Sequence, residues 1–227
     1  MKLRHNFPEE DLAHRLGVHQ TTVSRIFTSW MEALDACILE VDFWPSKADI
    51  QAQMPDIFRE QYPTTRCIID CAEIFTEKPR NPDTQSSTWS SYKNHNTLKC
   101  LLAVTSNGVP SFVSSCYGGR ISDKQITKLS GLLSPGKFDK GDSIMADRGF
   151  DIDDFLSGTH VKLNIPAFLD NREQLEEDEV VETRRIASLR VHVERAIERV
   201  KNYHILDLLP PSLCNQGSRL VRICVFF

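Results

Sequence analysis

The sequence is organised around one apolar stretch, Cys67-Ile68-Ile69-Asp70-Cys71-Ala72. Its nearly continuous apolar character predicts a buried β-strand. A carboxylate inside such a strand costs free energy unless it is paired or bound to a cation. A structural role for Asp70 is therefore hard to find, and a functional one is favoured.

Two further acidic residues lie beside apolar segments far along the chain. Asp147 follows the run 143–146, and Glu194 lies in a strongly helical stretch. Each also has an ordinary explanation, because Asp before Arg-Gly is common in turns and Glu194 could pair with Arg190 one helical turn earlier. Together with Asp70, the two could hold a pair of Mg²⁺ ions, which prefer carboxylate oxygen and activate water against a phosphodiester. The three carboxylates predict a metal site that cuts a phosphate backbone, and Glu73 is a weaker candidate.

Bulk composition limits the class of protein. The 227 residues are 41% hydrophobic and 26% charged, which is typical of one globular core with at most a small additional module. A formal charge of -4 argues against a general basic coat for nucleic acid, so any DNA contact must come from local patches. The seven cysteines contain no C-x-x-C pair and predict reduced core residues in the cytosol or nucleus. No apolar run is long enough to span a bilayer.

The N-terminal segment has the spacing of a helix-turn-helix. Ala13 is a small contact residue, Gly17 suits the turn, and Val23 suits an apolar plug between two helices. The second helix, about residues 20–30, would turn four side chains towards a DNA groove: Gln20, Thr21, Thr22 and Arg25. An ordinary helical hairpin packed on the main domain is the alternative.

The rest of the chain predicts an α/β protein. Residues 36–65 form a helical linker, and the main domain then alternates predicted strands and helices. The strands are expected at 67–72, 98–104, 109–116, 143–146 and 161–165, and the helices after Ser122 and at about 182–203. This order indicates a mixed sheet flanked by helices, compatible with a ribonuclease H-like core.

The last long helix carries many basic side chains. These are Arg184, Arg185, Arg190, Arg195, Arg199 and Lys201. One basic helix face of this kind is the best candidate for phosphate contacts. The alternative is that it only balances the acidic stretch at 173–182, which is itself expected to be a solvated loop or helix start.

Three blocks carry a resemblance to a known family. Residues 68–75, 143–150 and 192–201 resemble the catalytic blocks of Harbinger-like transposases, which are DDE-superfamily endonucleases and include forms with a THAP zinc finger upstream. Residues 118–123 and 180–187 also look like that family, and 12–30 is similar to the helix-turn-helix that precedes its nuclease domain. Matched block by block, Asp70, Asp147 and Glu194 take the places of the catalytic acids.

The resemblance implies a fold, an activity and a setting. It implies a ribonuclease H-like fold, a divalent metal (Mg²⁺ or Mn²⁺), a nuclear location, and cutting of double-stranded DNA at transposon ends followed by joining to target DNA. A separate DNA-binding partner protein and a homo-oligomer are compatible with it. The expected domains are a helix-turn-helix at 1–35, the linker at 36–65 and a nuclease domain at 66–227.

Two alternatives to an active transposase stay open. Because the chain lacks a THAP finger and stops inside an apolar run, we expect a truncated copy. A host-adopted, catalytically silent DNA-binding protein of the same fold is the first alternative. A phosphoesterase for small molecules is the second alternative. The helix-turn-helix argues against it, because an enzyme for small substrates does not need an element that recognises a DNA groove.

Overall fold

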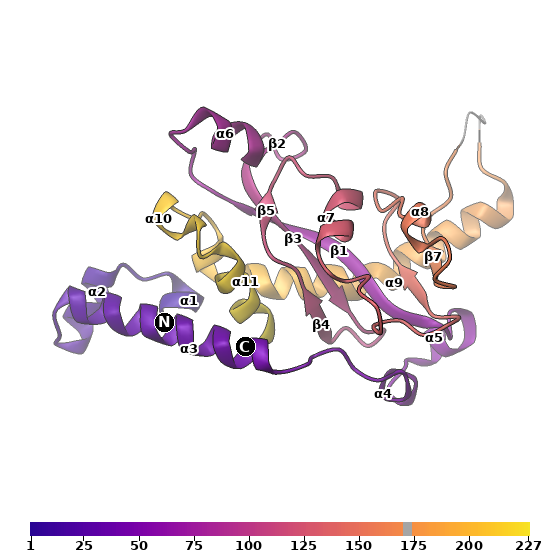
Figure 1. Ribbon diagram of the computed structural model, residues 1–227, viewed down its shortest axis with the longest axis horizontal. Coiled ribbons are helices and arrows are strands. Elements are labelled where there is room, and N and C mark those ends of the chain that lie inside the picture. Colours follow the sequence, from indigo (N-terminus) through magenta and orange to yellow (C-terminus); the bar gives the residue numbers. More distant parts are fainter. Residues whose placement is uncertain (170–173) are drawn as a thin grey trace.

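The computed structural model describes residues 1–169 and 174–227 and shows a mixed α/β fold (Figure 1). Its sheet has the strand order β2-β3-β1-β6-β7, with β4 and β5 also paired to β3. The strands are β1 (Thr65–Phe75), β2 (Trp89–Ser90), β3 (His95–Val104), β4 (Pro110–Val113), β5 (Tyr117–Gly118), β6 (Ser143–Met145) and β7 (Lys162–Asn164). The predicted mixed sheet flanked by helices is confirmed.

Helices lie on both faces of this sheet and at the N-terminal end. They are α1 (Lys2–His5), α2 (Glu9–Leu16), α3 (Gln20–Glu40), α4 (Lys47–Ala52), α5 (Asp56–Gln61), α6 (Pro82–Thr88), α7 (Asp123–Leu129), α8 (Asp153–Leu156), α9 (Glu177–Lys201), α10 (Pro211–Cys214) and α11 (Gly217–Phe226), with a 3₁₀ turn η1 (His204–Leu206). Among the described residues, no helix combines the length and the apolar character that a membrane span requires.

The register of the central strands sets the level of two acidic residues. β1 is antiparallel to β3 and parallel to β6, and Ile68 lies opposite Met145. Two residues further along each chain segment come Asp70 and Asp147. The strand pairing therefore brings positions 70 and 147 to the same level of the sheet.

Alternation along β1 divides the core into two layers. Ile68, Ala72 and Ile74 pack with the apolar stripe of α9 and with α11, whereas Cys67 and Ile69 pack on the opposite face with residues of α7 and α8. Successive side chains of a strand point to opposite faces. Asp70 therefore belongs to the face that α9 covers.

The long helix α9 buries the stripe that its periodicity predicts. Its core residues include Ile186, Leu189, Val193, Ile197 and Val200. The helix begins at Glu177, earlier than predicted, because Glu176 and Glu179 form a reciprocal capping box. The part of the acidic stretch from 177 onward is thus helix start, while 173 lies outside the described residues.

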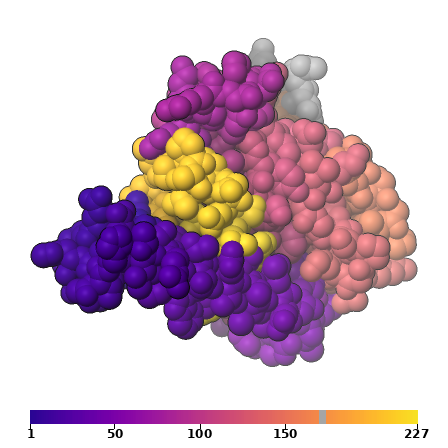
Figure 2. Space-filling view, turned by 60° about the vertical axis from the view of Figure 1, so that its left-hand side comes forward, coloured from indigo at the N-terminus to yellow at the C-terminus, as the bar shows by residue number. Residues whose placement is uncertain are grey.

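The helix-turn-helix spacing is also confirmed, with one difference. Gly17 ends α2 at φ 65°, in the left-handed region, and Leu12, Ala13 and Val23 form a small cluster between α2 and α3. The second helix does not stop near Trp30 but continues to Glu40, five residues past the expected domain boundary at 35. Tertiary contacts stabilise the longer helix, because its second half packs against α11, as the adjacent indigo and yellow surfaces in Figure 2 show.

Two smaller expectations need correction. The predicted strand at 109–116 is divided into β4 and β5, which both pair with β3. Ser122 caps α7 as predicted, but the apolar side expected from Ile126, Leu129, Leu132 and Leu133 is incomplete, because the helix ends at Leu129, which is exposed. Ile126 within the helix and Leu132 beyond it fill the core.

Candidate active site

The three acidic residues singled out in the sequence meet at one side chain, Arg190. Its Nη1 lies 3.1 Å from an Oδ of Asp147, and its Nη2 lies 3.7 Å from an Oδ of Asp70 and 3.9 Å from an Oε of Glu194. Residues separated by up to 124 positions in the sequence are thus brought together. The charges are only partly matched, because one guanidinium faces three carboxylates.

Different elements hold these carboxylates. Asp70 projects from the middle of β1 and accepts a hydrogen bond from the Cys71 N–H at 2.8 Å. Asp147 follows β6 and accepts one from the Arg148 N–H, also at 2.8 Å. Glu194 lies on α9, one residue after the buried Val193, so that it stands at the edge of the apolar stripe. A bond to the adjacent backbone fixes two of the three side chains before any ligand arrives.

Arg190 is buried rather than part of an open basic surface. Only 8% of the residue is exposed, and its Nε has no hydrogen-bond partner among the described residues. The expectation that Arg190 shares one basic face with Arg195 and Arg199 is therefore wrong. Residue 190 packs beside the apolar stripe of α9 and points at the sheet, where Asp70 supplies a counter-charge.

Burial changes the acid strength of Asp70. Desolvation is the main cause that raises its pKa to about 6, and the negative charges of Asp123 and Asp147 act in the same direction. The hydrogen bond from the Cys71 N–H and the charge of Arg190 lower the pKa, but not enough to cancel the burial. The ionised form of Asp70 is therefore kept at a cost in free energy.

The carboxylates line an open pocket of about 760 Å³. Its lining contains six acidic side chains, Asp70, Glu73, Asp123, Asp147, Glu194 and Glu198, and four basic ones, Lys93, Lys99, Arg190 and Lys201. The formal charge of the lining is therefore -2. Cys71, Tyr92 and Ile197 complete the lining.

A second ion-pair group lies beside the first and was not predicted as part of a site. The Lys99 Nζ is 2.6 Å from Asp123 and 3.9 Å from Glu73, and Thr97 donates a hydrogen bond of 2.9 Å to Glu73. Lys99 could have been found, because it is a lone charge in the apolar strand 98–104, just as Asp70 is in its own strand. Asp123 carried no such signal, because it is a first-turn acid of α7 and only the fold turns it towards Lys99.

The three carboxylates suit a hard divalent cation, but the Arg190 guanidinium already lies between them. Carboxylate oxygen is the ligand that Mg²⁺ and Mn²⁺ prefer. Among the described residues, however, no three His, Cys, Asp or Glu side chains stand close enough together to hold one ion. The guanidinium of Arg190 occupies the space between Asp70, Asp147 and Glu194, so these side chains must turn towards each other to bind a metal.

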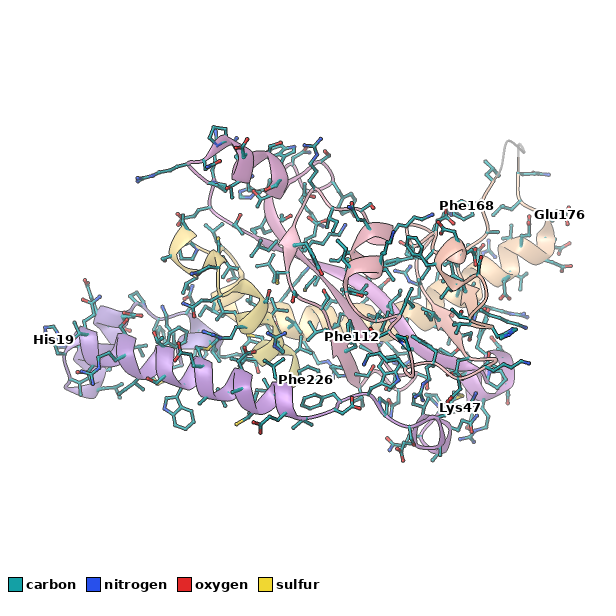
Figure 3. All side chains as sticks on the ribbon, in the orientation of Figure 1. His19, Lys47, Phe112, Phe168, Glu176 and Phe226 are labelled. Atoms are coloured by element: carbon teal, nitrogen blue, oxygen red, sulfur yellow. The ribbon has the colours of Figure 1, made fainter. Side chains whose placement is uncertain are left out.

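The other residues expected to contact DNA lie elsewhere. Arg195 and Arg199 line a separate hollow of about 480 Å³ beside the turn between β3 and β4, where Arg199 donates a 3.0 Å hydrogen bond to the Gly108 carbonyl. In the first turns of α3, three of the four candidates are exposed and Thr22 is half-buried: Gln20, Thr21, Thr22 and Arg25. Figure 3 shows His19, which caps α3, at one end of the molecule and Glu176, which caps α9, at the other.

Comparison with known proteins assigns the chain to a family. Residues 69–227, well over half of the chain, match the family described as DDE superfamily endonuclease. Residues 1–40 match the helix-turn-helix of DDE superfamily endonuclease. No curated protein and no solved structure matches the chain. The chain therefore belongs to the DDE superfamily endonucleases, with a ribonuclease H-like nuclease domain preceded by a helix-turn-helix.

Proposed function

We propose that this chain is a metal-dependent DNA endonuclease of the transposase type, which cuts at transposon ends and joins them to target DNA. Within the superfamily we place it with the Harbinger-like, THAP-associated transposases, on the sequence blocks described above. One observation carries the proposal: carboxylates from β1, from the end of β6 and from α9 surround the buried guanidinium of Arg190 in an open pocket.

The charge of the pocket supports a requirement for metal. A lining with a formal charge of -2 repels a phosphodiester, whereas two divalent cations would turn it to +2. Asp70, Asp147 and Glu194 would hold Mg²⁺ or Mn²⁺. Bound there, such ions polarise the scissile phosphate and activate water or a 3′-hydroxyl for attack.

The chain's own residues would position the strand. Asp70 and Asp147 are oriented by backbone N–H groups, which limits the reorganisation needed when a cation binds. Lys93 and Lys201 add positive charge to the lining, where they can contact phosphate oxygens on either side of the cut. Arg190, which partly neutralises the three carboxylates before metal binds, would then be free to pair with a phosphate of the DNA strand.

Recognition of double-stranded DNA would belong to the N-terminal helices. Gln20, Thr21, Thr22 and Arg25 would face a groove, and Arg195 and Arg199 would give a second phosphate contact from their own hollow. We propose a nuclear location on the same resemblance. We also propose that a DNA-binding partner protein or a second copy of the chain adds contacts to the transposon end.

A catalytically silent DNA-binding protein is the second candidate. It is favoured by the fact that Arg190 separates the carboxylates and that no described group of three ligands is ready for a metal. In that case the fold and the helix-turn-helix would serve DNA binding alone.

A plasmid assay separates the two candidates. Purified protein is incubated with supercoiled plasmid and Mg²⁺ or Mn²⁺, and wild type is compared with Asp147→Asn and with Asp151→Asn, a nearby carboxylate that pairs with Lys124 at the surface. The nuclease predicts nicked or linear plasmid for wild type and Asp151→Asn and none for Asp147→Asn. Cleavage that survives in Asp147→Asn contradicts the proposed site, and metal-independent binding without cleavage by wild type supports the silent protein.

A further inference from the structure

An exposed aromatic ring stands at the rim of the acidic pocket. Tyr92 is 81% exposed, more than any other large apolar or aromatic side chain in the part of the chain that the structure describes. It lines the same pocket as Asp70, Asp147 and Glu194. A tyrosine ring has a large apolar face that usually packs against something. Its position beside the carboxylates suggests that a ligand covers the exposed part of the ring.

The turn that carries Tyr92 is firmly held. β2 and β3 pair through Trp89 with Asn96 and Ser90 with His95, and the Lys93 N–H donates to the Ser90 hydroxyl at 3.3 Å. The buried Asn96 side chain anchors the base of this hairpin to α6 by donating to the Thr88 hydroxyl at 2.8 Å and to the Gln85 carbonyl at 2.9 Å. The ring is therefore presented by a short, braced hairpin rather than by a long loop.

The neighbour of Tyr92 supplies a positive charge. The Lys93 ammonium lies 4.5 Å from the centroid of the Tyr92 ring, and both side chains line the pocket. An aromatic face next to a cation is the combination with which proteins bind single-stranded nucleic acid: the base stacks on the ring and its phosphate meets the cation.

An uncharged contact is of particular use in this pocket. The lining is negative before metal binds, so charge alone does not attract a DNA strand into the pocket. Stacking does not depend on that charge. It requires a base whose face is free, however, and in a duplex each face is covered by the neighbouring base pair.

We propose that Tyr92 is a stacking platform for an unpaired base of the DNA strand held in the pocket, with Lys93 on the phosphate of the same nucleotide. The inference rests on the proposed function for the identity of the strand. To the proposed nuclease site it adds Tyr92 as a residue that positions the DNA strand, and it requires that a nucleotide next to the cut be unpaired.

The test measures stacking directly, with and without metal. The probe is an oligothymidylate with one central 2-aminopurine, whose fluorescence falls when the base stacks on another ring, in one buffer with Mg²⁺ and in a second buffer with a chelator. Wild type is compared with Tyr92→Phe, Tyr92→Ala and Phe227→Ala, the last being an exposed aromatic outside the pocket. Tyr92→Ala should bind about tenfold more weakly and lose the quenching, because one stacked base contributes this order of affinity. Tyr92→Phe and Phe227→Ala should behave as wild type.

The outcomes separate this inference from the nuclease proposal. Equal binding and quenching by Tyr92→Ala and wild type would overturn the stacking platform, whether or not the wild type cuts plasmid. Loss of quenching in Tyr92→Phe as well would overturn it too, since the ring would then not be the contact. A wild type that quenches through Tyr92 but never cuts plasmid with metal would keep the stacking site and refute the nuclease. Thermal unfolding of each variant checks that the hairpin remains folded.

Discussion

Two clusters of arginine and carboxylate in this molecule have net charges of opposite sign. On α3, Asp35 is 8% exposed and meets two arginines of α11: Arg222 donates to it at 2.7 Å and Arg219 lies 3.5 Å away. In the pocket, one equally buried arginine, Arg190, meets three carboxylates. Both clusters bury charge, but only the second has more anions than cations.

The difference indicates what each cluster is for. The Asp35 cluster joins the second helix of the helix-turn-helix to the C-terminal helix, next to the stacked rings of Phe43 and Phe226, whose centroids are 3.9 Å apart. Its extra positive charge reaches solvent through Arg219. The pocket instead keeps an excess of negative charge in partly desolvated surroundings, which is expensive unless a cation binds. We interpret the first cluster as structural and the second as a ligand site.

The largest expected effect is on catalysis. Glu194→Gln removes one anionic ligand and should lower metal-dependent plasmid cleavage by about 10²–10³-fold, the usual cost of removing one electrostatic contact to a transition state. Glu60→Gln, an exposed carboxylate on α5, is the control and should cut as wild type does. Gel quantification of plasmid nicking gives the rates. Equal rates for Glu194→Gln and Glu60→Gln would remove Glu194 from the site.

The next effect concerns the structural cluster. Asp35→Ala leaves Arg219 and Arg222 without their shared acid and should reduce the free energy of unfolding by about 3 kcal/mol. Asp56→Ala breaks an ion pair with Arg59 in which the acid is 89% exposed, and should cost less than about 0.5 kcal/mol. Urea denaturation compares the two. If both variants lose the same small amount, the Asp35 cluster does not hold the helices together.

Asp70→Asn should change stability in the opposite direction: it should raise the free energy of unfolding of the metal-free protein. Burial raises the folded-state pKa of Asp70 to about 6, above its ordinary value near 4. The charged form therefore destabilises the fold as pH rises through this interval, and the cost is complete above pH 6. Asp70→Asn should gain about 2 kcal/mol at pH 8 and almost nothing at pH 4. Denaturation at both pH values measures this, and a loss of stability at pH 8 would mean that the pair with Arg190 outweighs the burial.

The smallest effect tests the compensating role of Arg190. Arg190→Gln leaves three carboxylates without their cation, but two of them, Asp147 and Glu194, are more than half exposed and screened by water. We expect a loss of about 1 kcal/mol in stability without metal. Added Mg²⁺ should stabilise this variant more than it stabilises wild type, because the ion then has no competing guanidinium. Thermal unfolding with and without Mg²⁺ gives both values, and an equal response to Mg²⁺ in the two proteins would contradict this role.

The sequence predicts the local parts of this structure well, and the reason is physical. Apolar continuity identifies β1, and the apolar stripe of α9 follows from helical periodicity, since both patterns are written within one element. The burial of Arg190 was not predicted, because periodicity places a residue beside a stripe without saying what lies opposite. Lys99 faces Glu73 only through the antiparallel register, and α3 extends to Glu40 only through contacts with α11, far away in sequence. Pairings between distant elements decide these features.

The most direct test of the difference between the two clusters is the location of a bound cation. Crystals soaked in millimolar Mn²⁺ can be measured at the manganese absorption edge, where anomalous density marks the ion. We predict density in contact with Asp70 and Asp147, a guanidinium of Arg190 that has moved away from them, and no density at Asp35. A pocket without manganese, in which Arg190 still lies between the carboxylates, would contradict the assignment of this site to metal-dependent chemistry.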